Sequence, residues 1–191
     1  MHKGRLEAFS DGVIAIIITI MVLELKVPHG AGLAALSGLA PVFLSYVLSF
    51  IYVGIYWNNH HHLFQAVKHI NGAVLWANLH LLFWLSLFPF ATAWAGENHF
   101  APWTVAAYGG VLLMAGIGYR TLVRVLLAGH EADSHLARAM GADFKGKLSL
   151  VIYAAAIPLA FWQTWLSLAL YVLVAVIWLV PDRRIEKTLA S

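Results

Sequence analysis

Two carboxylic acids interrupt the first long apolar segment of the sequence, and they are its first candidates for chemistry. Asp11 and Glu24 both fall within residues 9–27. A charge held at the depth of a bilayer costs several kcal/mol, so an acidic residue kept there usually bonds to a neighbour or carries a proton or ion. Asp11 is therefore either a group hydrogen-bonded to neighbouring helices or the titrating carrier of a proton-coupled permease.

Three consecutive histidines, His60, His61 and His62, are the second candidate. Imidazole titrates near neutral pH and binds zinc or copper, which suggests a pH sensor or a metal site. Consecutive residues of a helix point in different directions, and no cysteine or nearby acidic cluster completes a ligand set. We therefore expect no metal and no cofactor, whereas a role in pH modulation stays open.

Composition places these residues in a membrane protein. Hydrophobic residues make up 61% of the 191 residues and charged residues only 11%, against about 25% charged in ordinary soluble domains. A soluble core cannot absorb so much apolar surface. The chain is long enough for about six spans of roughly 20 residues, and it leaves no room for a large extramembrane domain.

Six apolar runs, separated by short polar segments, predict the elements that position the candidate residues. An all-α integral membrane protein follows, with one six-helix transmembrane domain over residues 1–191. The predicted spans are 9–27, 33–56, 72–95, 101–127, 148–162 and 164–180.

The basic residues predict the orientation. Eleven of the 12 lysines and arginines fall on one side of a six-span arrangement, and only Lys26 falls on the other. Cytoplasmic loops carry such an excess, so both termini are predicted to be cytoplasmic in a multi-pass protein of the cell membrane. The basic residues are scattered at helix ends and do not gather on one face, so we expect no nucleic-acid partner. The eleven are Lys3, Arg5, Lys68, Arg120, Arg124, Arg138, Lys145, Lys147, Arg183, Arg184 and Lys187.

One face of the first predicted span is apolar. At 100° per residue this face is shared by Gly12, Ile16, Thr19, Ile20 and Leu23. Asp11 points well away from it, so Asp11 is expected to meet neighbouring helices. Periodicity alone leaves lipid contact, helix packing and the lining of a pore open for this face.

Two motifs in order resemble those of a known family. Arg5, Phe9, Ser10 and Asp11 match an Arg-x-x-x-Phe-Ser-Asp signature, and residues 56–64 resemble a Trp-x-x-His-His-x-x-Phe segment at the end of the second helix. Both are similar to motifs of the transmembrane protein 175 family, which comprises endosomal and lysosomal potassium channels and a bacterial branch. The resemblance covers essentially the whole chain.

The resemblance implies a homotetramer in the bacterial cytoplasmic membrane, with four first helices around a central pore. The pore constriction is then carried by Ile16, Ile20 and Leu23, with Thr19 adjoining. Other motif residues support the pore: Ser10 and Asp11 bond to polar groups on the second and third helices, for which His61, His62, Asn78 and His80 are available. The supporting set is Arg5, Phe9, Ser10, Asp11, His61 and His62.

The predicted function is a passive, potassium-permeable cation channel. A hydrophobic ring passes an ion only after the ion sheds water or the ring widens, and potassium holds its water less tightly than sodium. The predicted selectivity for potassium over sodium is therefore weak to moderate. The alternative is a secondary transporter that uses Asp11. An intramembrane enzyme is not expected, because His80 with Ser86 is too sparse a constellation.

Overall fold

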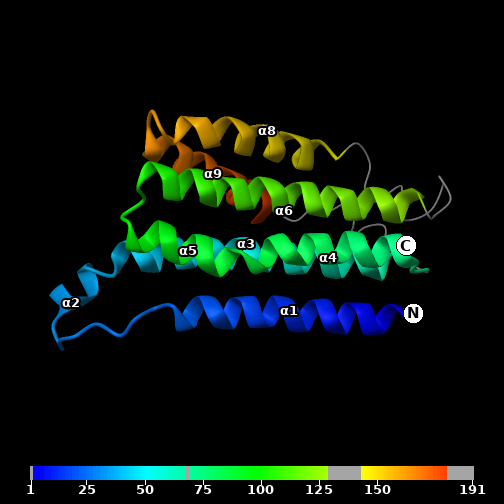
Figure 1. Cartoon of the computed structure of the whole chain (residues 1–191), viewed down its shortest axis with the longest axis horizontal. Helices are drawn as coiled ribbons and strands as arrows, with labels where there is room; N and C mark the ends of the chain where they lie inside the picture. Colours follow the sequence, from blue (N-terminus) through cyan, green and yellow to red (C-terminus); the bar gives the residue numbers. More distant parts are fainter. Residues whose placement is uncertain (1, 68, 129–142, 180–191) are drawn as a thin grey trace.

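The computed structural model describes residues 2–67, 69–128 and 143–179, and all the regular secondary structure in that part of the chain is helical. Its helices run roughly parallel to one another in a bundle, with α1 along one side and α8 along the opposite side (Figure 1). The helices are α1 (Lys3–Leu23), α2 (Leu33–Ser37), α3 (Ala40–Gln65), α4 (Gly72–Ser86), α5 (Phe88–Glu97), α6 (Pro102–Ala128), α8 (Phe144–Leu159) and α9 (Thr164–Leu179).

Four helical segments of the described chain are long and apolar enough to cross a membrane. They are α1, α3, the continuous run Gly72–Glu97 formed by α4 and α5, and α6. The shortest of them, α1, has 21 residues and extends about 32 Å at 1.5 Å per residue, which matches a hydrocarbon core of about 30 Å. The last two predicted spans correspond to α8 and α9, which have 16 residues each.

The second predicted span, 33–56, differs from the helix in the structure. A separate short helix, α2, covers Leu33–Ser37, and α3 begins only at Ala40 with Pro41 in its first turn. Proline has no N–H to give to a preceding turn, so it favours a helix start. At its other end α3 continues nine residues past 56, to Gln65. There His60 bonds Asn78 inside the protein, and His61 meets Gln65 on the exposed side of the same helix.

A break separates α4 from α5 at Leu87, inside the third predicted span. Pro89 lies in the first turn of α5 and cannot donate the hydrogen bond that would continue α4. The Leu87 carbonyl accepts from the Ala91 N–H at 3.0 Å, so the chain resumes a helix within one turn.

Glycines bring α6 close to two of its neighbours. A Cβ atom at Gly118 would lie 3.1 Å from the Cα of Leu81 on α4, and a Cβ at Gly109 would overlap the hydroxyl of Tyr171 on α9. Small residues permit such approach between membrane helices. Helix α6 therefore packs closely against α4 and α9.

Helix α1 lies at the edge of this bundle, against α3, α4 and α5. The basic residues of α1, α6 and α8 lie at helix ends that share one end of the bundle (Figure 1). Lys3 Nζ donates to the carbonyl of Gln65 at 3.4 Å and so joins the start of α1 to the end of α3. Lys68, Arg138, Arg183, Arg184 and Lys187 lie outside the described residues.

Candidate functional site

The candidate residues of α1 divide between two faces. Ile16, Ile20 and Leu23 are 59%, 41% and 75% exposed, and Thr19 is exposed beside them. The Thr19 hydroxyl donates to the carbonyl of Ala15 at 2.9 Å, which leaves its oxygen lone pairs directed away from the helix backbone. One face of α1 therefore presents hydrocarbon with a single hydroxyl acceptor.

The opposite face of α1 is buried against α3, α4 and α5. Its apolar contacts come from Leu6, Ile14, Ile17 and Met21, each at most 3% exposed. These positions recur at three- and four-residue spacing, as expected for one side of a helix. Ser10 is the buried polar residue on this side.

Ser10 is held in a hydrogen-bond chain that crosses three helices. The Ser10 hydroxyl donates to the Leu6 carbonyl at 2.9 Å and accepts from Asn78 Nδ2 on α4, also at 2.9 Å. Asn78 therefore presents its carbonyl oxygen to His60 Nε2 on α3, 2.8 Å away, which requires the imidazole hydrogen to lie on Nε2. All three side chains are at most 1% exposed, so each hydrogen bond satisfies a group that water cannot reach.

Asp11 has a different partner. The Trp57 indole N–H on α3 donates to Asp11 Oδ1 at 3.1 Å, and the Trp57 ring stacks on His61. His61 in turn meets Gln65, with their side-chain nitrogens 2.8 Å apart. This second chain is more exposed than the first, since Trp57 is 46% exposed and Asp11 is only partly buried.

The structure pairs some of the predicted supporting residues and separates others. Asn78 bonds Ser10 as expected, but neither His61 nor His62 makes a hydrogen bond to Ser10 or Asp11. The histidine in the buried chain is His60, and Trp57 takes the role that was expected of a histidine beside Asp11. The side chains of Arg5 and Phe9 are exposed on α1. The contacts of Ser10 and Asp11 attach α1 to α3 and α4.

Sequence reasoning missed Trp57 and His60 as partners of the α1 motif. His62 Nδ1 is buried and has no hydrogen-bond partner in the described part of the chain. His80 bonds within its own helix, where its Nε2 accepts from Trp84 at 3.0 Å. The signal that could have found them is their spacing, since Trp57 and His60 lie three residues apart and so share one side of α3. Trp57 bonds Asp11 directly, and His60 is joined to Ser10 through Asn78.

At the other end of α1 an ion pair fastens the following loop to α5. Lys26 Nζ lies 2.6 Å from Glu97 Oε1. The hydrogen bond to this carboxylate, and its charge, raise the pKa of Lys26 above its ordinary value of 10.5. Both side chains are largely exposed, at 77% and 47%, so solvent screens the pair.

Replacing Lys26 with methionine should therefore have little effect on stability at neutral pH. A lysine with a raised pKa adds stability below its ordinary pKa and loses it as the pH rises through the raised value. We expect wild-type protein to show a small drop in thermal unfolding temperature at strongly alkaline pH that Lys26→Met lacks. A large fall in the unfolding temperature of Lys26→Met at neutral pH would show instead that the ion pair contributes strongly to holding α1 in place.

No three His, Cys, Asp or Glu side chains within the described ranges are grouped as metal ligands. The arrangement suits a helix that is fixed on one face and offers an apolar surface on the other. It supplies no nucleophile with a base at the exposed face of α1.

Comparison with known proteins agrees with these features. The sequence profile of the family described as "Endosomal/lysosomal potassium channel TMEM175" matches residues 5–89. The protein named Potassium channel HX13_20290, from Chryseobacterium sp. (strain P1-3), is 57% identical over 189 residues, which cover 99% of this chain and 98% of that protein. The chain belongs to the TMEM175 family. It is therefore a multi-pass membrane protein of an ion-channel family and not an enzyme.

A solved member of the TMEM175 family has the same fold. The crystal structure of a lysosomal potassium-selective channel TMEM175 homolog from Chamaesiphon minutus matches with a TM-score of 0.80 at 30% identity, covering 93% of this chain and 96% of that one. The human protein named endosomal/lysosomal proton channel TMEM175 is 42% identical over 80 residues, which are 36% of this chain and 16% of that protein.

Proposed function

We propose that the chain is one subunit of a passive potassium channel whose pore is lined by the exposed face of α1. Four subunits surround the pore as a homotetramer in the cell membrane. Each subunit crosses the membrane six times, with α8 and α9 as the last two spans and both termini in the cytoplasm. Family membership and the relatives named potassium channels support the conducted ion.

The observation that carries this proposal is the two-sided character of α1. Its buried face is fixed by Ser10, which bonds Asn78, while Ile16, Ile20 and Leu23 remain exposed on the other face. Helix packing within one subunit leaves that face uncovered. Four copies of it around an axis form a narrow stack of apolar rings.

Such rings pass ions by partial dehydration, or after they widen, because a hydrophobic constriction excludes water. Potassium loses water more readily than sodium, which gives a weak to moderate preference for potassium. Four copies of Thr19 add one ring of hydroxyl oxygens. Each hydroxyl hydrogen is donated to the carbonyl of Ala15, so each oxygen is free to accept from water or to meet the ion.

Reversal potential in a planar bilayer tests the proposal. Purified protein is placed between potassium chloride on one side and an equal concentration of sodium chloride on the other. We expect a current that reverses toward the potassium equilibrium potential. A folded, inserted preparation that carries no current, or a subunit count of two by cross-linking, would contradict the proposed pore.

A secondary transporter is the second candidate, because Asp11 is a partly buried carboxylate in a membrane-spanning helix. Asp11→Asn separates the two functions. Asparagine keeps the acceptor for the Trp57 N–H and removes the titrating group. A channel should keep its potassium current within about threefold, since a neutral acceptor replaces a supporting group far from the exposed face.

Potassium flux into liposomes measures this variant, with and without an imposed pH gradient. Flux that depends on the pH gradient in wild type and disappears in Asp11→Asn would support the transporter and contradict the proposed channel. Trp57→Phe is the matched control, because it removes the same hydrogen bond and retains the carboxylate.

A further inference from the structure

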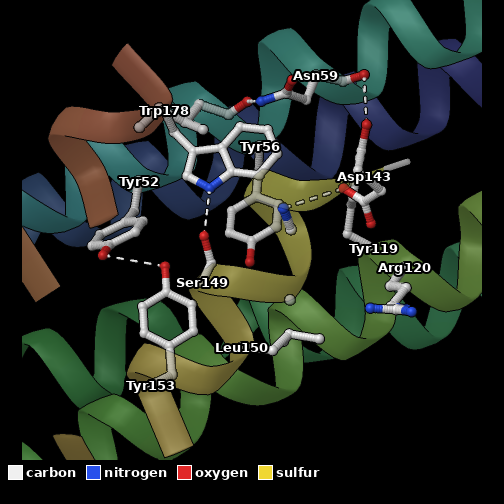
Figure 2. Close-up of a pocket in the computed structure, with 13 residues that line it drawn as sticks. Tyr52, Tyr56, Asn59, Tyr119, Arg120, Asp143, Ser149, Leu150, Tyr153 and Trp178 are labelled. Carbon is white, nitrogen blue, oxygen red and sulfur yellow. Dashed lines mark hydrogen bonds between the residues drawn. The ribbon is translucent and has the colours of Figure 1, made fainter. Parts of the chain in front are cut away.

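A cavity of about 50 Å³ lies between α3, α6, α8 and α9, away from the exposed face of α1. Five of the 13 residues that line it are aromatic, and Arg120 and Asp143 lie on one side of it (Figure 2). Arg120 belongs to the second half of α6 and Asp143 caps the start of α8, so the cavity lies toward the end of the bundle that carries the basic residues.

Most polar groups around the cavity are already paired. The Trp178 N–H donates to the Ser149 hydroxyl at 2.9 Å, and that hydroxyl donates to the Lys145 carbonyl at 2.8 Å. Deeper in the wall, the Tyr153 hydroxyl donates to the hydroxyl of Tyr52 at 3.2 Å. These groups have little left to offer a ligand.

Two donors in the wall differ from the rest. The Arg120 guanidinium is partly buried, and it makes no hydrogen bond or ion pair with the residues that the structure describes. The Tyr56 hydroxyl likewise has no hydrogen bond to them, and Figure 2 shows the Tyr56 ring between Ser149 and Asp143. Arginine stays charged at all physiological pH values, so Arg120 can offer an anion in the cavity charge-assisted hydrogen bonds.

Asp143 does not supply that anion. Its Oδ1 accepts from the Gly146 N–H at 3.2 Å, which places the carboxylate on the N-terminus of α8, where the helix dipole favours negative charge. A Cβ atom at Gly146 would overlap this carboxylate, so glycine permits the cap. The carboxylate lies more than an ion-pair distance from Arg120, which is the one cation among the described residues that line the cavity.

We propose that this cavity binds the phosphate of an anionic membrane lipid. Arg120 pairs with the phosphate and the Tyr56 hydroxyl donates to one of its oxygens, while the acyl chains stay in the bilayer. Basic pockets between membrane helices at the cytoplasmic surface suit anionic head groups, and the basic end of this bundle is the one predicted to face the cytoplasm. The head groups of anionic lipids lie at this membrane surface, which is why we propose a lipid as the source of the phosphate.

Native mass spectrometry of the delipidated full-length protein in nonionic detergent tests the site. Phosphatidylglycerol is compared with phosphatidylcholine that carries the same acyl chains. We expect preferential binding of phosphatidylglycerol, and a loss of about tenfold in affinity for Arg120→Gln, the usual cost of one charge-assisted hydrogen-bonded pair. Arg124→Gln is the matched control, because Arg124 lies about one turn further along α6, is exposed and does not line the cavity.

Three results would overturn the proposal. Equal losses in the two arginine variants would indicate diffuse attraction to a basic surface. Equal binding of both lipids would remove the head-group preference. Displacement of phosphatidylglycerol by an equal concentration of inorganic phosphate would show a free-anion site. If the Arg120→Gln protein is not monodisperse, Tyr56→Phe tests the site in its place. We expect its affinity for phosphatidylglycerol to fall about threefold, because one neutral hydrogen-bond donor is lost.

Discussion

Replacing Ile16 with asparagine is expected to raise the potassium conductance of the channel about tenfold and to reduce its preference for potassium over sodium. In the proposed tetramer, four Ile16 side chains form an apolar ring, and asparagine supplies four amides that hold water in it. Dewetting is the barrier at such a ring, and a barrier lowered by about 1.4 kcal/mol raises a rate tenfold. An ion sheds less water to pass a more hydrated ring, so potassium, which sheds water more easily than sodium, loses its advantage in permeation.

Single-channel recording with potassium and sodium on opposite sides measures both effects. Ile16→Leu should keep a conductance close to wild type, since it preserves the ring's volume and apolar surface. Val22→Asn places the same amide on another side of α1 at a residue that is 44% exposed, and it should leave both quantities unchanged. Equal effects of Ile16→Asn and Val22→Asn would show that Ile16 faces lipid or another helix.

Helical periodicity predicted which residues of α1 share a face, but it left open whether neighbouring helices cover that face. The wheel grouped Ile16, Thr19, Ile20 and Leu23, and these side chains are exposed while Ile14 and Ile17 are buried. The prediction succeeds because α1 packs along one side of the bundle for its whole length, so the same face of the helix is turned toward the bundle from end to end. What the exposed face meets depends on other molecules, which periodicity within one chain does not contain.

The choice among three histidines could not be made from their sequence. Successive residues of α3 differ by 100° in direction, so only one of them can face Asn78, and that one is His60. Which one it is depends on the rotation of α3 relative to α1 and α4. That rotation is fixed by tertiary packing, and the residue types around positions 60–62 do not indicate it.

Trp57 illustrates a second limit. A tryptophan near the predicted end of a span is typical of a membrane interface, where its ring is favoured without any specific partner. In the structure α3 continues to Gln65, and the indole N–H of Trp57 bonds Asp11. The second span was predicted to end at residue 56, so Trp57 was placed at the end of a helix. For that reason it was not considered as a partner of Asp11.

Asn78 offers the largest expected effect on stability. Asn78→Leu keeps nearly the same side-chain volume and removes both hydrogen bonds that join Ser10 to His60. The His60 N–H and the Ser10 oxygen are then left unsatisfied at sites that are at most 1% exposed. Each unsatisfied buried group costs about 1–3 kcal/mol, so we expect a loss of about 2–4 kcal/mol in the free energy of unfolding.

Denaturant unfolding of the detergent-solubilised protein, followed by circular dichroism, measures this loss. Asn98→Leu is the control and should change stability by less than about 0.5 kcal/mol, because Asn98 is exposed and bonds only the Trp94 carbonyl one turn away. The double variant Ser10→Ala with Asn78→Leu should recover part of the loss, since one of the two stranded groups is gone. Recovery would show that the hydrogen bonds of Ser10 and Asn78 stabilise the attachment of α1 to α4. Strict additivity would mean that Asn78 stabilises α4 without holding α1.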